Sequence, residues 1–233
     1  MFLPMFTIPS SAIRLLRSGF VLSLLSASLW GADLSSYRGF KFGSTVAVVA
    51  KSGGLSPTDV KLIHQQPALV QEMEWQGQPR TSDGKSDSVR DGVLSFLNGQ
   101  LYRIVATYDR YQVEGMTADD MIERISQTYG AATRPNVEIP YVSIYGKTAP
   151  VIARWEDASY AYNLIRTGDK ATYAMVMYSK SLDAAAQAAI VEAARLDVLA
   201  APQRARDEAQ KRLDEDRIAL EKARTTNKPN FKP

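Results

Sequence analysis

The chain has 233 residues with no cysteine and one histidine, and its formal net charge is +3. The absence of cysteine excludes disulfides and thiolate metal sites, and one histidine cannot build a zinc or copper site that needs several. Residues 1–32 hold two arginines and no acidic residue, so the rest of the chain has 26 basic and 25 acidic residues. Such a balance gives no reason to expect nucleic acid as a partner, and the composition indicates no cofactor.

The first predicted element is a secretory signal peptide over residues 1–32. Arg14 and Arg17 precede an apolar run of small and aliphatic residues at 19–32, and Asp33 ends that run. The order is typical of a signal peptide, and the run is shorter than the roughly 20 apolar residues that span a bilayer. We expect cleavage after Ser28 or Ala32 and export of a bacterial protein to the periplasm or out of the cell. An uncleaved anchor and a buried core helix are the alternatives.

Two capped helices are predicted in the region that follows. Residues 43–45 open an apolar stretch that stops at the glycines 53–54. A second stretch begins near Thr117, which has capping-box spacing to Asp120, and ends at Gly130, where a left-handed C-cap is expected. Each pattern predicts a short helix.

Antiparallel strands are predicted after each helix. Residues 70–76 and 92–109 follow the first helix, and Asn98-Gly99 inside the second range is a strong hairpin signal. Three further stretches follow the second helix, at 151–157, 159–166 and 171–179. Residues 56–66 fit either a short helix or a strand, and we favour the helix.

These elements predict an α+β fold of two helix-plus-antiparallel-meander units in tandem, followed by C-terminal helices. The units cover residues 37–113 and 114–180, and Trp75 and Trp155 fall at equivalent places in them. The C-terminal helices cover 181–224, with Pro202 interrupting or restarting the helix, and 225–233 is predicted to be a disordered tail.

A doubled unit of this kind resembles a known architecture. The glycine-bounded helix, the strands carrying a tryptophan and the hairpin with Asn98-Gly99 look like the β-lactamase inhibitor protein, and are similar to the single-copy SmpA/OmlA (BamE-type) outer-membrane assembly lipoproteins and to uncharacterised bacterial exported proteins. The chain departs from these families because it has neither the acylated cysteine nor the disulfides. The resemblance implies the fold and a binding role, and it implies no residue roles.

The chemical motifs are sparse. His64 has no nucleophile motif to work with, and a lone histidine is more often a surface residue. Asp83, Asp87 and Asp91 recur in a polar loop, but Val89 occupies a slot where a calcium loop needs a ligand, so we favour a solvated loop. An enzyme of unrecognised type would have to use tyrosines and carboxylates; its candidate acids are Asp109, Glu156 and Asp157.

Aromatic and methionine side chains along the strands are the candidate binding surface. Alternation along the chain places Tyr102, Ile104 and Tyr108 on one face of the sheet and Leu101 on the other. One face has to meet the helices, and the other could remain an aromatic platform for a partner; core packing is the alternative for each residue. The candidate residues are Tyr102, Tyr108, Tyr160, Tyr162, Tyr173, Met175 and Met177.

The charged stretch 204–224 is predicted to be a solvated helix, with contact to a protein or an anionic surface as the alternative. Its apolar positions Ala205, Ala209, Leu213 and Leu220 are too few to indicate a coiled coil by themselves. The sequence therefore predicts an exported, non-catalytic module that binds another protein through its sheet face or this helix. Any membrane contact would be peripheral.

Overall fold

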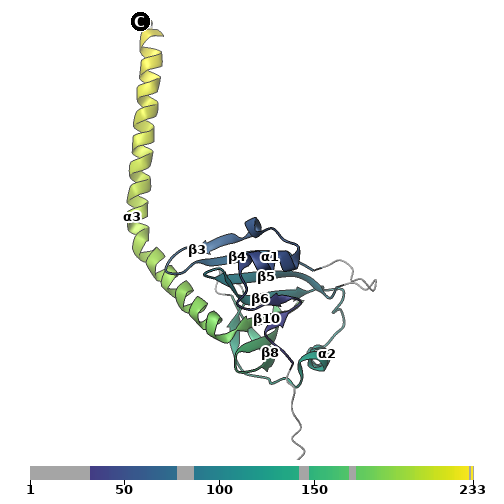
Figure 1. Ribbon diagram of the computed structural model, residues 1–233. Coiled ribbons are helices and arrows are strands. Elements are labelled where there is room, and N and C mark those ends of the chain that lie inside the picture. The colour runs from purple at the N-terminus through teal and green to yellow at the C-terminus, as the bar shows by residue number, and fades with distance from the viewer. Residues whose placement is uncertain (1–31, 78–86, 142–146, 168–171, 231, 233) are drawn as a thin grey trace, which may run out of the picture. The chain divides into compact units, whose positions relative to one another are not determined.

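The structure is a computed structural model that describes residues 32–77, 87–141, 147–167, 172–230 and 232. In this part of the chain it is an α+β fold with one eight-stranded antiparallel sheet, two short α-helices and a long C-terminal helix (Figure 1). The predicted signal peptide, apart from Ala32, lies outside the described residues.

The elements of the first half are β1 (Ser36–Tyr37), β2 (Phe40–Lys41), α1 (Val46–Gly53), the 3-10 turn η1 (Pro57–Asp59), β3 (Lys61–His64), β4 (Val70–Gln76), β5 (Val89–Leu97) and β6 (Gln100–Tyr108). Those of the second half are α2 (Ala118–Tyr129), β7 (Glu138–Pro140), β8 (Thr148–Glu156), β9 (Tyr160–Thr167), β10 (Thr172–Ser179), α3 (Lys180–Asn227) and the 3-10 turn η2 (Lys228–Asn230). The large sheet has the order β3-β4-β5-β6-β10-β9-β8-β7, so β6 and β10 meet at its centre.

Local signals in the sequence place several of these elements correctly. Strand β4 coincides with the predicted residues 70–76. The turn between β5 and β6 has a φ of 49° at Asn98 and 78° at Gly99, the two positive angles that a type I′ hairpin turn requires. Helix α2 has the expected capping box, because Asp120 N–H donates to Thr117 Oγ1 at 3.2 Å and Thr117 N–H donates to Asp120 Oδ2 at 2.7 Å. Gly130 has the positive φ expected of it, although its ψ of −162° is not that of a left-handed cap.

The short helix favoured for residues 56–66 is wrong for most of that range. Ser56 caps only the single turn η1, and Lys61–His64 form β3. The strand forms because β4 lies beside it and supplies its pairing partners. Each meander therefore has four strands, since β3 and β7 extend the two predicted sets of three.

The C-terminal region is one continuous helix instead of several. Helix α3 starts directly after β10 and runs through Pro202 to Asn227. It is helical over Thr225 and Thr226, where the sequence predicts the disordered tail to begin; their hydroxyls donate to the carbonyls of Glu221 and Lys222 at 2.9 and 3.0 Å.

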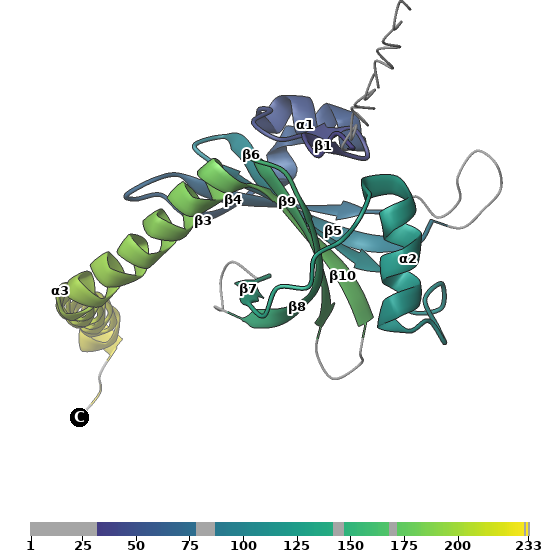
Figure 2. The same cartoon turned by 90° about the horizontal axis from the view of Figure 1, so that it is seen from below.

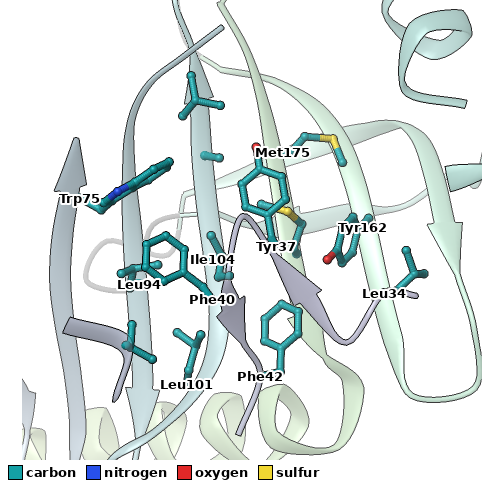
Figure 3. Close-up of a cluster of buried hydrophobic side chains, with 14 of the residues drawn as sticks. Leu34, Tyr37, Phe40, Phe42, Trp75, Leu94, Leu101, Ile104, Tyr162 and Met175 are labelled. Carbon is teal, nitrogen blue, oxygen red and sulfur yellow. The ribbon is translucent and has the colours of Figure 1, made fainter. Parts of the chain in front are cut away.

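The main core lies between one face of the sheet and the elements α1, α2 and the β1–β2 hairpin. Val49 of α1 and Met121 of α2 belong to one buried cluster with side chains of the sheet. Figure 3 shows Tyr37, Phe40 and Phe42 of the N-terminal hairpin lying over Trp75, Leu94 and Met175. The second tryptophan, Trp155 of β8, is buried in the same cluster.

Helix α3 docks on the opposite face of the sheet (Figure 2). Ala186 packs with Val70, Leu97 and Tyr102, and Leu182, Ala189 and Ile190 surround this contact. From Ala201 to Asn230 every residue is exposed except Asp214, which is half-buried. Only the first part of α3 therefore belongs to the folded body.

A bulge in β6 changes which side chains share a face. Ser95 pairs with Arg103 but the adjacent Phe96 pairs with Leu101, so Tyr102 is the extra residue. Leu101 consequently joins Ile104 in the main core, while Tyr102 faces α3. The strict alternation predicted along this strand is wrong at this point, because a bulge inserts one residue without a partner.

Candidate functional site

The described surface has two adjoining pockets beside α2, which we call the α2 groove. The first pocket has a volume of about 400 Å³ and the second about 430 Å³, and both are lined by Val113 and Met116. The first is further lined by Tyr37, Arg38, Ser88, Tyr108, Gln112, Met121, Arg124, Ile125, Thr128 and Tyr129. The second is further lined by Arg110, Glu114, Gly115, Arg166, Thr172 and Tyr173.

Several parts of the chain bring these residues together, among them β9 with Arg166 and β10 with Tyr173. Tyr37 and Arg38 come from the N-terminal hairpin, Tyr108 ends β6, and the inward side of α2 supplies Met121 and Ile125. The segment between β6 and α2 is shaped by Asp109, whose Oδ1 accepts the N–H groups of Tyr111 and Gln112 at 2.8 and 3.3 Å. The Thr117 cap then fixes where α2 starts.

The floor of the first pocket is a cluster of phenols that stay neutral. Burial raises the pKa of Tyr37 to about 12 and raises the pKa of Tyr108 well above its usual value. Burial also raises the pKa of Tyr129 and of Tyr162, which lies behind them with its ring centroid 5.0 Å from that of Tyr129. At neutral pH these residues provide apolar ring surface and hydroxyl hydrogen bonds but no charge.

Arginines lie along both pockets. Arg38 forms an ion pair with Asp87 at 2.6 Å and lies over the Tyr37 ring at 5.6 Å. Arg124 is exposed on α2 and donates to Gln127 at 2.7 Å. In the second pocket Arg166 lies over the Tyr173 ring at 5.3 Å, and Arg110 lines the wall. The described lining residues include four arginines and one acidic residue, Glu114, so basic groups outnumber acidic ones even though Asp87 offsets the charge of Arg38.

The α2 groove offers hydrogen-bond donors and positive charge, and Glu114 is the one carboxylate among its described lining residues. Among its described lining residues there is no histidine. The arrangement is suited to holding an anionic, partly apolar group.

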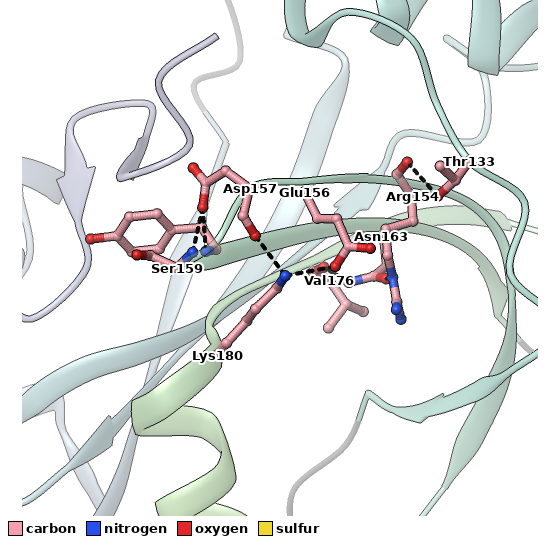
Figure 4. A network of polar contacts seen from close by, with 9 residues as sticks. Thr133, Arg154, Glu156, Asp157, Ser159, Asn163, Val176 and Lys180 are labelled. Atoms are coloured by element: carbon pink, nitrogen blue, oxygen red, sulfur yellow. Dashed lines mark hydrogen bonds and ion pairs between the residues drawn. The ribbon is translucent and has the colours of Figure 1, made fainter. Parts of the chain in front are cut away.

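The acids proposed for an enzyme do not converge. Asp109 shapes the loop before α2, and Glu156 forms an ion pair with Lys180 at 2.8 Å. Asp157 accepts the N–H groups of Ser159 and Tyr160 at 2.6 and 2.7 Å, as Figure 4 shows together with the Lys180 contact. Each carboxylate thus has a local structural partner.

Neither His64 nor the aspartates considered for a calcium loop are among the described lining residues of the α2 groove. Asp83 lies outside the described residues, whereas Asp87 and Asp91 form ion pairs with Arg38 and Arg90. Within the described ranges there is no group of three or more metal-ligating side chains. His64 lines a separate pocket of about 450 Å³ between the end of β3 and α3.

Most of the predicted aromatic platform is inside the protein. Tyr102, Tyr162, Tyr173, Met175 and Met177 are buried in the described structure, and Tyr108 and Tyr160 are half-buried. Tyr108 and Tyr173 line the α2 groove, while Tyr160 stacks on Phe42 with ring centroids 5.5 Å apart.

Sequence reasoning missed the residues that complete the groove. These are Tyr37, Arg38, Met116, Arg124 and Tyr129. A signal was present in α2, where Arg124 and Tyr129 flank the apolar positions Met121 and Ile125, but nothing in the sequence indicated that the N-terminal hairpin lies opposite.

No family model, curated protein or solved structure matches this chain. The resemblance to the β-lactamase inhibitor protein and the SmpA/OmlA family stays a prediction. Among the described helices, none is both long enough and apolar enough to cross a membrane.

Proposed function

We propose that the protein is an exported, non-catalytic module that binds an acidic segment of another protein in the α2 groove. The observation that carries the proposal is the pairing of an apolar phenol-and-methionine pocket with arginines on its sides. An apolar anchor side chain fills such a pocket while neighbouring carboxylates meet the guanidinium groups. The N-terminal order of basic and apolar residues supports export.

We also propose that the two halves of the body are copies of one unit. Each half has a helix followed by four antiparallel strands, and the strand order is mirrored about the β6–β10 pair. Trp75 and Trp155 lie on β4 and β8, the second strand of each half. If the halves are copies, sequence profiles built from relatives should align Trp75 with Trp155. Profiles that align the halves in another register would contradict the proposal.

The binding proposal is tested with synthetic acidic peptides that carry one aromatic residue, in an array where the acidic residues are replaced by lysine in half of the members. Binding of a fluorescent peptide to the mature chain should be saturable, specific for the acidic members and weaker at high salt, because exposed charges are screened. Arg124→Glu should weaken it by about tenfold or more, since it places a like charge beside the peptide. NMR shift changes should map to α2 and the N-terminal hairpin.

A matched control is Arg212→Glu, which makes the same charge reversal on the exposed part of α3. Equal loss of binding in both variants would show a non-specific charge effect. Peptide binding that is unchanged in Arg124→Glu, or that maps outside the α2 groove, would contradict the proposal.

A further inference from the structure

Helix α3 carries an exposed apolar seam on the side away from the sheet. The docked side contains Leu182, Ala186 and Ala193, whereas Val191 and Val198 are 70% and 73% exposed. Further along, Leu213 and Leu220 are 64% and 70% exposed. We define the outer seam as Val191, Val198, Ala205, Ala209, Leu213 and Leu220.

The spacing places these residues on one side of the helix. Val191 and Val198 are seven residues apart, as are Leu213 and Leu220. At about 100° per residue, the four side chains fall within about 60° of one another. An apolar repeat of this spacing is what two helices use to pair. The seam is longer than the stretch from Ala205 to Leu220, because the exposed valines of the docked part extend it.

The charges between residues 204 and 221 of α3 are segregated, and the basic residues Lys222 and Arg224 follow them. Residues 204–212 have four basic and two acidic side chains, whereas residues 214–221 have four acidic and one basic. The in-helix pairs of this region are exposed: Lys211 to Glu215 is 3.9 Å and Arg212 to Glu208 is 3.8 Å, whereas Arg217 to Asp214 is 3.2 Å and Arg204 to Asp197 is 3.1 Å. Such pairs contribute little on their own, so the charges remain available to a second helix.

We propose that α3 pairs with α3 of a second copy of this chain in antiparallel orientation. An antiparallel pair that crosses near Leu213 sets the basic stretch of each copy against the acidic stretch of the other. Asp216, which interrupts the outer seam, then lies close to opposing basic residues. A parallel pair would instead set basic against basic and acidic against acidic, which is unfavourable. The second copy covers the part of the outer seam from Ala205 to Leu220, and the proposal does not depend on the α2 groove.

The first test is the mass of the mature chain in solution, measured by sedimentation velocity over a wide concentration range. The wild-type chain should dimerise. The double variant Leu213→Gln with Leu220→Gln should raise the dissociation constant of the dimer at least about tenfold, because burying one leucine side chain already changes such a constant by about that factor. Ile218→Gln is the matched control: Ile218 is 63% exposed like the leucines but lies on the opposite side of the helix, so dimerisation should be unchanged. A wild-type chain that stays monomeric, or equal weakening by Ile218→Gln, would overturn the proposal.

Orientation is tested with single cysteines, which is possible because the natural chain has none. A mixture of Ala205→Cys and Ala223→Cys proteins should form the mixed disulfide under mild oxidation, and Ala223→Cys alone should form few dimers. Predominant linkage of Ala223→Cys to itself would show parallel pairing and contradict the antiparallel arrangement. Circular dichroism of each variant checks that α3 remains helical.

Discussion

Arg103 of β6 is a buried cation that joins three elements. Its Nη2 lies 2.6 Å from Asp183 Oδ1 of α3, another guanidinium N–H donates to the carbonyl of Pro140 of β7, and the Tyr178 ring lies 5.4 Å away. Arg103 is 3% exposed, so the pair is largely removed from water. Its position explains how the docked end of α3 and the outermost strand are fixed to the same residue.

Removing one partner of this pair should be strongly destabilising. Arg103→Met leaves the Asp183 carboxylate buried without its cation, which typically costs about 3–5 kcal/mol. The double variant Arg103→Met with Asp183→Leu should recover much of the loss, because no charge is then left unpaired. Urea unfolding of wild type and the single and double variants measures this. A single variant as stable as wild type would show that the pair has no structural role.

The tyrosine cluster gives the molecule a stability limit at alkaline pH. The pKa of Tyr37 is raised to about 12, whereas an unfolded tyrosine has a pKa of about 10. Because the pKa of Tyr37 is higher in the folded than in the unfolded chain, the neutral phenol contributes fully to the free energy of unfolding below about pH 10. This contribution is lost as the pH rises through about 12. Phenolate absorbance of this cluster should therefore appear together with unfolding instead of near pH 10. Replacing Tyr129 by Phe should reduce the alkaline loss, and full phenolate absorbance of a still folded protein near pH 10 would contradict this.

Helix α3 has two parts with different energetic roles. Its first part buries Ala186 and Ala193, while the residues beyond Ala200 bury almost nothing. A chain truncated after Ala201 should consequently melt within a few degrees of the mature protein, since little apolar surface is lost. Differential scanning calorimetry measures this, with truncation after Ser179 as the strongly destabilised control. A large fall in melting temperature after the first truncation, measured at a protein concentration too low for α3 pairing, would show that the free part belongs to the core.

Pro202 lies inside α3 and deprives the carbonyl of Val198 of its helical donor. Close to this point Arg204 Nη2 donates to the carbonyl and to Oδ1 of Asp197 at 2.8 and 3.1 Å. Figure 1 shows that α3 bends along its length, and a proline is the usual cause of such a bend. Helix α3 thus continues through Pro202, where the sequence predicts an interruption or a restart.

Elements with strong local signals could be predicted from the sequence, and elements that depend on distant partners could not. The Asn98-Gly99 turn and the Thr117 cap act within a few residues, and both were placed correctly. The residues of β3 fit a strand as well as a helix, and only the pairing with β4 decides between the two. The displacement of Tyr102 comes from a bulge that periodicity does not reveal.

The candidate site was less predictable than the fold for the same reason. Tyr37 and Tyr129 line one pocket, although about ninety positions separate them in the chain. Tyrosines were recognised as candidates along the strands, but burial removed most of them from the surface. Only the tertiary structure distinguishes a phenol that fills the core from one that lines a groove.

Both edges of the large sheet are poorly suited to adding a strand. Strand β3 is short and has an irregular register between Leu62 and His64, and Lys61 lies on it. Strand β7 has three residues and ends at Pro140. Short, irregular edges with lysine or proline are how proteins limit sheet-to-sheet association. The α2 groove and α3 are accordingly the described surfaces on which we place partners.

The direct junction between Ser179 of β10 and Lys180 of α3 has a mechanical consequence. No loop separates the helix from an inner strand that pairs with β6 on one side and β9 on the other. Tension applied to the C-terminal end of α3 therefore acts on β10, the strand through which the two halves meet. When β10 is pulled out of the sheet, β6 and β9 each lose one neighbouring strand. Optical-tweezers pulling on the ends of the mature chain should show one cooperative extension step for the whole sheet. Two separate steps, one for each half, would show that the halves bear load independently.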